Sequence, residues 1–197
     1  MKIIRIKGSI SSAGFLQGHR FVIGHWEHSP IGSFGDVMWG TPDGRRVLLA
    51  GSQVAADFVT SIYNFDEVRI GDLQIKSDGR ETSAEGLGVK LYFSGGWARH
   101  IPFPRPLAFT KFIERPIAKR LMGVETFGTS SRGISEWYQA EQWRWVESGN
   151  AELEGTDLGL PSPFSQPINV GFSEPPTKPA IVSLRVTIKF PSDEGML

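Results

Sequence analysis

Glycine and proline interrupt this sequence so often that few segments are long enough for a helix of several turns. The chain has 23 glycines and 13 prolines among its 197 residues. Both residue types favour chain reversals, and frequent reversals between short apolar runs are typical of proteins built from many short strands. Hydrophobic residues make up 40% and charged residues 21% of the chain, which is enough apolar material for a packed core. We therefore predict a mainly β protein.

Short apolar runs, several of them alternating with polar residues, indicate about ten strands. The clearest local feature is Thr41-Pro-Asp-Gly44, in which Pro42 presets φ and Gly44 accepts a positive φ. It predicts a hairpin between strands at 34–39 and 46–50. The other predicted strands cover residues 2–7, 21–26, 67–70, 73–76, 87–93, 125–127, 134–140, 143–147, 151–154 and 181–190.

Two segments change from strand spacing to helical spacing. Apolar residues recur every three or four positions in residues 52–63, and Ser52 can cap the first free backbone amides. Residues 107–122 follow the same spacing, but Pro116 lies inside them, so we predict a kinked helix or two short pieces. No change of composition divides the chain. We predict one domain over residues 1–197: an antiparallel, strongly curved sheet with two helices, closed or nearly closed into a barrel.

Composition excludes several kinds of site and partner. The chain has no cysteine, so disulfides, thiolate metal sites and cysteine nucleophiles are excluded. Its formal net charge is zero, which argues against a nucleic-acid partner. Residues 1–7 lack the apolar core of a signal peptide, and no run approaches the length of a membrane helix. We expect a cytoplasmic protein with no cofactor, no metal and no membrane partner; an oligomer stays possible.

Titratable residues near the predicted strands supply weak catalytic candidates. His25 and His28 flank Trp26-Glu27, but spacing of i, i+3 on a strand puts the two imidazoles on opposite faces, which disfavours a metal site. Asp36 and Glu136 each lie in an apolar and aromatic run. A carboxylate that points into a barrel would have a raised pKa and could transfer protons. Alternation does not decide which face either carboxylate takes, so Asp36, Glu136 and His25 stay open as candidates.

Six tryptophans are numerous for this length, and aromatic side chains both fill barrels and line pockets for apolar ligands. Most should belong to the core, with a minority lining a cavity. We predict that the ligand-binding residues are Trp26, Trp39, Trp97, Trp137 and Arg46.

Residues 99–120 carry six Lys or Arg residues against one acid, Glu114. Phenylalanines opposite basic residues suit an interfacial membrane helix. They equally suit a helix that packs its phenylalanines on the barrel and shows its charges to water, and we predict this second arrangement.

Three stretches resemble the acetoacetate decarboxylase-like superfamily. Phe34-Gly-Asp-Val-Met-Trp39 with its hairpin resembles the paired central strands of the family, and residues 54–63 are similar to the helix that follows them. Residues 127–143 resemble a late hairpin that leads into a tryptophan-bearing strand. The resemblance covers about half of the chain and implies a cone-shaped antiparallel barrel with an internal cavity.

One departure from the family bears on activity. The decarboxylases place a Schiff-base lysine just after that helix, whereas residues 63–69 of this chain contain none. The resemblance therefore implies the fold without the decarboxylase mechanism. We expect non-covalent binding of a small apolar or carboxylate ligand in an aromatic-lined cavity. The alternative is an enzyme of lyase or hydrolase type that uses a carboxylate on a small carbonyl or carboxylate compound.

Overall fold

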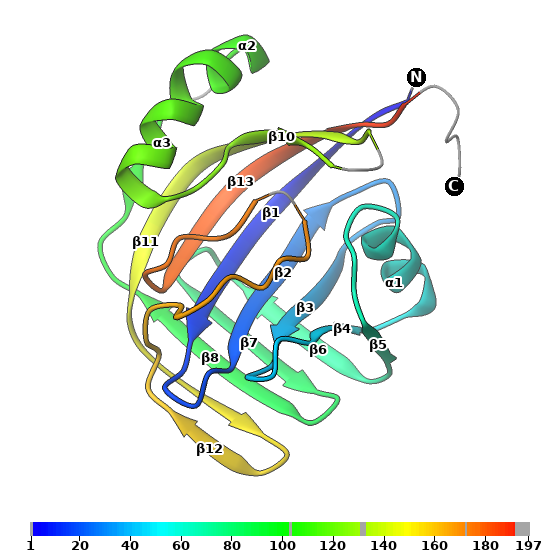
Figure 1. The fold of residues 1–197 in the computed structure, drawn as a ribbon, viewed down its shortest axis with the longest axis vertical. Coiled ribbons are helices and arrows are strands. Elements are labelled where there is room, and N and C mark those ends of the chain that lie inside the picture. Colours follow the sequence, from blue (N-terminus) through cyan, green and yellow to red (C-terminus); the bar gives the residue numbers. More distant parts are fainter. Residues whose placement is uncertain (1, 103, 131–132, 172, 192–197) are drawn as a thin grey trace.

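A computed structural model describes residues 2–102, 104–130, 133–171 and 173–191. Ten strands follow one another along a single curled sheet in the order β5-β4-β3-β2-β1-β13-β11-β8-β7-β6, and β9, β10 and β12 pair with β11 beside this path (Figure 1). The strands are β1 (Ile3–Gly14), β2 (Arg20–His28), β3 (Phe34–Gly40), β4 (Arg46–Ala50), β5 (Glu67–Ile70), β6 (Leu73–Ser77), β7 (Glu81–Gly86), β8 (Val89–Gly95), β9 (Arg99–His100), β10 (Phe127–Thr129), β11 (Ser135–Leu153), β12 (Thr156–Gly159) and β13 (Ala180–Lys189).

The sheet is an open half-barrel of mixed direction, so the prediction of a closed or nearly closed antiparallel barrel was wrong, whereas the mainly β class is confirmed. Strand β5 runs parallel to β4 because helix α1 (Gln53–Thr60) carries the chain across between them. Strands β5 and β6 form the two ends of the sheet. The chain turns between them, and Ile75 of β6 packs on Gly35 of β3. A closed barrel would need hydrogen bonds between the two edge strands, β5 and β6, which do not pair.

Strand β11 joins the two halves of the sheet. Its first half pairs with β13 and its second half with β8, with register shifts at Ala140/Gln142 and Val146/Ser148. Bulges of this kind bend and twist a strand. The three short strands predicted for residues 134–154 are therefore one strand of 19 residues.

The predicted hairpin and the predicted first helix are confirmed. The hairpin joins β3 to β4 through a turn in which the Gly44 amide donates to the Thr41 carbonyl. Helix α1 begins after Ser52, whose hydroxyl accepts from the Ala55 amide at 3.2 Å. Its buried residues, Ala55, Ala56, Phe58 and Val59, pack on one face of the sheet.

The two faces of the sheet bury separate cores. Side chains of β2, β3 and β4 meet those of β7 and β8 inside the half-barrel, where Phe21, Ile23, Leu91 and Phe93 are almost fully buried. On the opposite face, Leu48, Leu184 and Ile188 pack with α1 and neighbouring residues. The interior of the half-barrel is thus filled by side chains.

A second helical segment lies outside β11 and consists of α2 (Leu107–Phe109), a π-helical turn (Thr110–Glu114) and α3 (Arg115–Met122) (Figure 1). Pro116 has no amide proton for the Phe112 carbonyl, and the wider turn just before it accommodates the ring. The prediction that this segment packs its phenylalanines on the barrel was wrong. Phe109 is 43% and Phe112 67% exposed.

Candidate ligand-binding site

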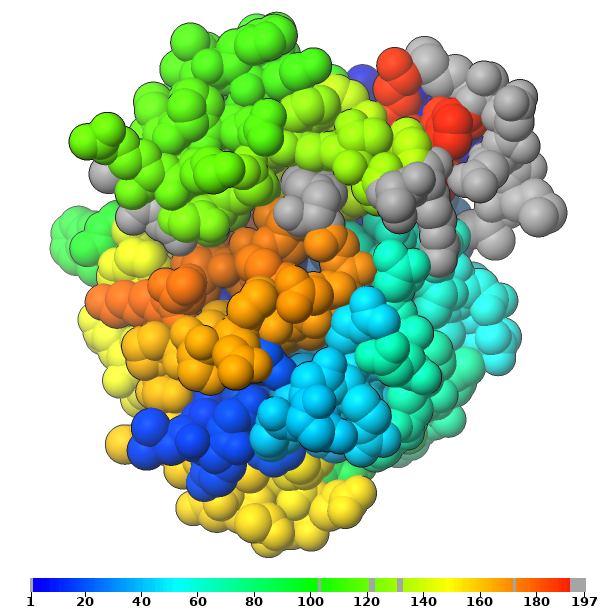
Figure 2. Space-filling model, viewed as in Figure 1, coloured from blue at the N-terminus to red at the C-terminus, as the bar shows by residue number. Residues whose placement is uncertain are grey.

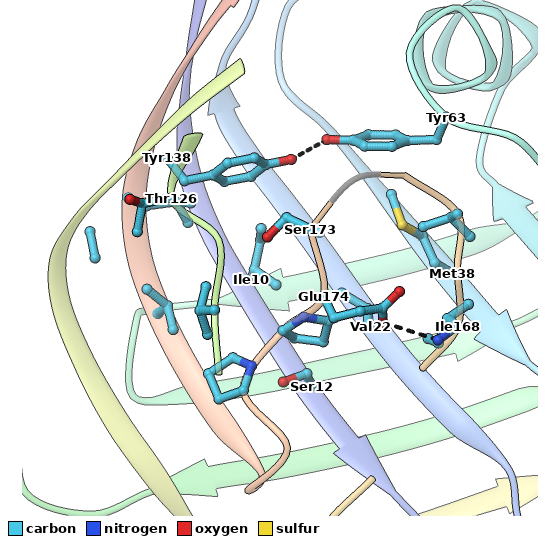
Figure 3. Close-up of a pocket in the computed structure, with 18 of the residues that line it drawn as sticks. Ile10, Ser12, Val22, Met38, Tyr63, Thr126, Tyr138, Ile168, Ser173 and Glu174 are labelled. Atoms are coloured by element: carbon cyan, nitrogen blue, oxygen red, sulfur yellow. Dashed lines mark hydrogen bonds between the residues drawn. The ribbon is translucent and has the colours of Figure 1, made fainter. Parts of the chain in front are cut away.

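A cavity of about 140 Å³ lies on the face of the sheet opposite the half-barrel interior. The roof of the cavity is formed by a segment that crosses β1 and β2, here called the strap (residues 161–171 and 173–179) (Figures 1 and 3). Val124 and Thr126 complete the roof. In the space-filling view the strap, coloured orange, covers the centre of this face below the green helical segment (Figure 2). The cavity wall is mostly aliphatic, with a few polar groups.

Strand alternation and register bring the floor of the cavity together. Every second residue of a strand points to the same face. In β1, β2 and β3 the aligned positions are Ile10, Gly24 and Asp36, and Val182 of β13 lies beside Ile10. All four residues line the cavity.

Asp36 is the one carboxylate on this floor, and it is only 1% exposed. Its Oδ1 accepts a hydrogen bond from Trp26 Nε1 at 3.1 Å, whereas its Oδ2 is buried without a partner among the described residues. Burial raises the pKa of Asp36 to about 7, although the Trp26 bond lowers it. A buried carboxylate with one free oxygen and a near-neutral pKa can donate or accept one further hydrogen bond.

Gly24 makes room for this pair of side chains. A Cβ at position 24 would lie 2.5 Å from Asp36 Oδ1 and 2.7 Å from Trp26 Nε1. Any larger residue would therefore displace the carboxylate or the indole. The glycine sets where Asp36 sits on the cavity floor.

One end of the cavity is closed by two tyrosines that share a buried glutamate. Tyr63 follows α1, and Tyr138 lies on β11; their hydroxyls are hydrogen-bonded to each other (Figure 3). Both hydroxyls also lie within hydrogen-bonding distance of Glu136 Oε2, at 2.8 Å from Tyr63 and 3.0 Å from Tyr138. Burial raises the pKa of Glu136 to about 7 against the effect of these two bonds. Burial and the nearby carboxylates keep the pKa of both tyrosines well above 10, so both hydroxyls stay protonated.

Polar contacts hold the strap over the cavity. The buried Arg20 side chain donates to the Pro167 carbonyl at 2.8 Å and to the Thr41 carbonyl at 2.6 Å. Glu174 accepts from the backbone amides of Ile168 and Asn169 at 3.0 and 2.7 Å, which closes a turn inside the strap (Figure 3). The roof is therefore attached to the sheet at a defined position.

The structure brings only part of the predicted site together. Asp36 and Trp26 line the cavity, and Glu136 lies behind its two tyrosines. Trp39 belongs to the half-barrel core and donates to His19 Nδ1. Trp137 packs on Phe127, and Trp97 is 81% exposed. Arg46 pairs with Asp66 at the surface. His25 is half-buried and does not line the cavity. None of the described residues forms a metal-binding cluster, at the histidines or elsewhere.

Sequence reasoning missed Tyr63, Tyr138, Gly24 and the strap as parts of the site. Tyr138 carried one usable signal, because it lies two residues after Glu136 and therefore on the same face of the strand. No predicted strand or helix covers the strap. Its contribution depends on contacts 147 residues apart, as between Arg20 and Pro167.

A comparison of the chain with known protein families, curated proteins and solved structures found no match.

Proposed function

We propose that this protein binds a small, largely apolar molecule non-covalently in the cavity under the strap. The observation that carries the proposal is the free Oδ2 of Asp36, buried in a wall that is otherwise mostly aliphatic. Small-molecule sites commonly combine apolar walls with one or two polar groups that fix orientation. No lysine is among the described residues that line the cavity, which supports binding without a Schiff base.

The volume limits the ligand to about one ring. An engineered apolar cavity of roughly 150 Å³ in another protein binds benzene, and the cavity here measures about 140 Å³. The ligand should carry a hydroxyl or amine that donates to ionised Asp36, or an acceptor for its protonated form. A buried polar atom left without a partner is costly, so a ligand that pairs with Oδ2 gains over one that does not.

Phenol and toluene test this proposal because they differ mainly in one hydrogen-bonding group. At pH 8 phenol should bind about tenfold or more tightly than toluene, since a hydrogen bond to a charged group contributes roughly 1.5–3 kcal/mol. An NMR titration that follows the Trp26 indole proton, whose nitrogen donates to Asp36, measures both affinities directly.

Asp36→Asn should bring the two affinities close together, because the ionised acceptor is lost. Asp43→Asn serves as the matched control, since Asp43 is an exposed aspartate in the hairpin turn. It should leave the ratio unchanged. A preference for phenol that survives Asp36→Asn, or the absence of binding by either compound, would contradict the proposal.

A second candidate function is proton transfer on a small carbonyl compound. It is favoured by the near-neutral pKa of Asp36 and by the tyrosine hydroxyls that share the cavity. Ionised Asp36 would take a proton from the carbon next to the carbonyl. The electron pair would then reside on the enolate oxygen, which a tyrosine hydroxyl would stabilise, and Asp36 would return the proton.

Exchange of butanone α-protons for deuterium in D₂O, followed by NMR, tests this second candidate. The native chain should accelerate the exchange, and Asp36→Asn should abolish the acceleration while Asp43→Asn keeps it. Exchange at the buffer rate with the native chain would leave binding as the function supported by the site.

A further inference from the structure

The second helical segment exposes four of its apolar residues, whereas its Thr110 is buried. Phe109, Phe112, Ile113 and Ile117, here called the apolar stripe, are 43%, 67%, 46% and 53% exposed. They recur at helical spacing and therefore lie along one side of the segment. The segment stands outside β11 and, in the space-filling view, is not covered by the rest of the chain (Figures 1 and 2).

Specific polar contacts hold the segment in this orientation. Thr110 is fully buried, and its hydroxyl accepts from Gln139 Nε2 of β11 at 2.9 Å. Glu114 forms an ion pair with Arg105, and these two side chains are only 17% and 8% exposed. To bury the apolar stripe against the sheet, the segment would have to rotate and give up these contacts. These contacts thus keep the apolar stripe exposed.

The accessible charges around the apolar stripe are positive. Residues 107–122 contain four basic residues and one acid, Glu114. Just after them, Glu125 is 20% exposed and pairs with Arg115 and Lys119, whose side chains are 42% and 65% exposed. Arg120 is exposed as well. Both acids are therefore less accessible than Arg115, Lys119 and Arg120.

We propose that the apolar stripe docks this protein on the surface of an anionic phospholipid membrane. Aromatic and aliphatic side chains would enter the boundary between headgroups and acyl chains, while the flanking cations contact lipid phosphates. Among the described residues, no helix is long and apolar enough to cross a membrane. The segment would therefore lie in the plane of the interface.

Charge complementarity selects lipid over a second copy of the chain. A two-fold dimer through the apolar stripe would place the same patch of each copy against its equivalent. The accessible cations of one segment would then face those of the other. An anionic lipid surface supplies the opposite sign and covers the same apolar side chains.

Co-sedimentation with vesicles tests the proposal. The native chain should pellet with phosphatidylcholine vesicles that contain about one-third phosphatidylglycerol, should stay in the supernatant with pure phosphatidylcholine, and should be released by salt. Phe112→Ser with Ile117→Ser should weaken binding about tenfold or more per residue. Both side chains are exposed, so circular dichroism should show an unchanged thermal midpoint.

Leu16→Ser with Leu160→Ser is the matched control, because these leucines are 91% and 76% exposed outside the helical segment. This variant should bind anionic vesicles like the native chain. Equal loss in the control, equal binding to neutral vesicles, or no binding at all would overturn the proposal. A concentration-dependent dimer in analytical ultracentrifugation that only the stripe variant loses would assign the surface to a second copy instead.

Discussion

Unfolding by urea should require less denaturant as the pH rises from about 5 to 8, and Asp36→Asn should remove a large share of that trend. Burial raises the pKa of Asp36 from 3.8 to about 7. Between these values the folded chain holds a proton that the unfolded chain has released, so stability falls with rising pH. The slope for one such group is about 1.4 kcal/mol per pH unit. The trend should end above the folded pKa.

Other groups influence the same measurement. Glu136 contributes in the same direction, because burial raises its pKa from 4.5 to about 7. Burial lowers the pKa of His19 below its ordinary value of 6.5, so this group acts in the opposite direction and adds stability as the pH rises towards 6.5. Arginine partners lower the pKa values of the surface carboxylates Asp66 and Glu67, so these two groups change the stability only below about pH 4.5. The difference between native and variant chains isolates Asp36.

The measured quantity is the free energy of unfolding of the native chain minus that of Asp36→Asn, taken at each pH. This difference should fall by about 3 kcal/mol between about pH 5 and pH 8. Glu136→Gln should give a similar trend. Asp43→Asn should give none in this range, because the lowered pKa of Asp43 means that this group titrates only in more acidic solution. A flat difference for Asp36→Asn would show that this carboxyl is ionised throughout, and the cavity floor would then carry a fixed charge.

Arg20→Met should destabilise the protein by about 2–4 kcal/mol and loosen the strap. The buried guanidinium spans the strap and the hairpin turn through the Pro167 and Thr41 carbonyls. Methionine keeps part of the packing volume but donates no hydrogen bond, so the Pro167 carbonyl loses its donor in a buried place. The roof of the cavity would then lose its attachment to β2.

Arg46→Met is the matched control for Arg20→Met. Arg46 also donates to a strap carbonyl, that of Asn169 at 3.3 Å, but it is partly exposed and pairs mainly with Asp66. Exposed ion pairs contribute little to stability, so its removal should cost a small fraction of the Arg20 effect. Urea unfolding measures the difference, and hydrogen exchange of the Ile168 and Asn169 amides reports strap opening. Equal effects of the two variants would contradict the role given to Arg20.

Several elements could be predicted from the sequence because neighbouring residues determine them. The turn at Thr41–Gly44 depends on the φ preferences of Pro42 and Gly44, and α1 depends on its Ser52 cap and helical spacing. These preferences act over a few residues and survive in any compatible fold. The mainly β class follows from the same local signals.

The face taken by Asp36 could not be predicted, because residues on both sides of β3 are buried. Val37 and Trp39 point into the half-barrel core, whereas Met38 lines the cavity with Asp36. Alternation identifies the buried face of a strand only when the other face meets water. The strap supplies the second cover, and its position depends on distant contacts such as that of Arg20.

The openness of the sheet and the orientation of the second helical segment were also decided by tertiary structure. The sequence by itself determined the short strands, the hairpin, α1 and the kinking proline, since each depends on local φ preferences and spacing. Only tertiary structure placed Ile75 over Gly35, so that β6 packs on β3 and the edge strands β5 and β6 do not pair. It also turned Thr110 inward and Phe112 outward. The buried hydrogen bond from Gln139 to Thr110 holds the helical segment in this orientation against the hydrophobic pattern.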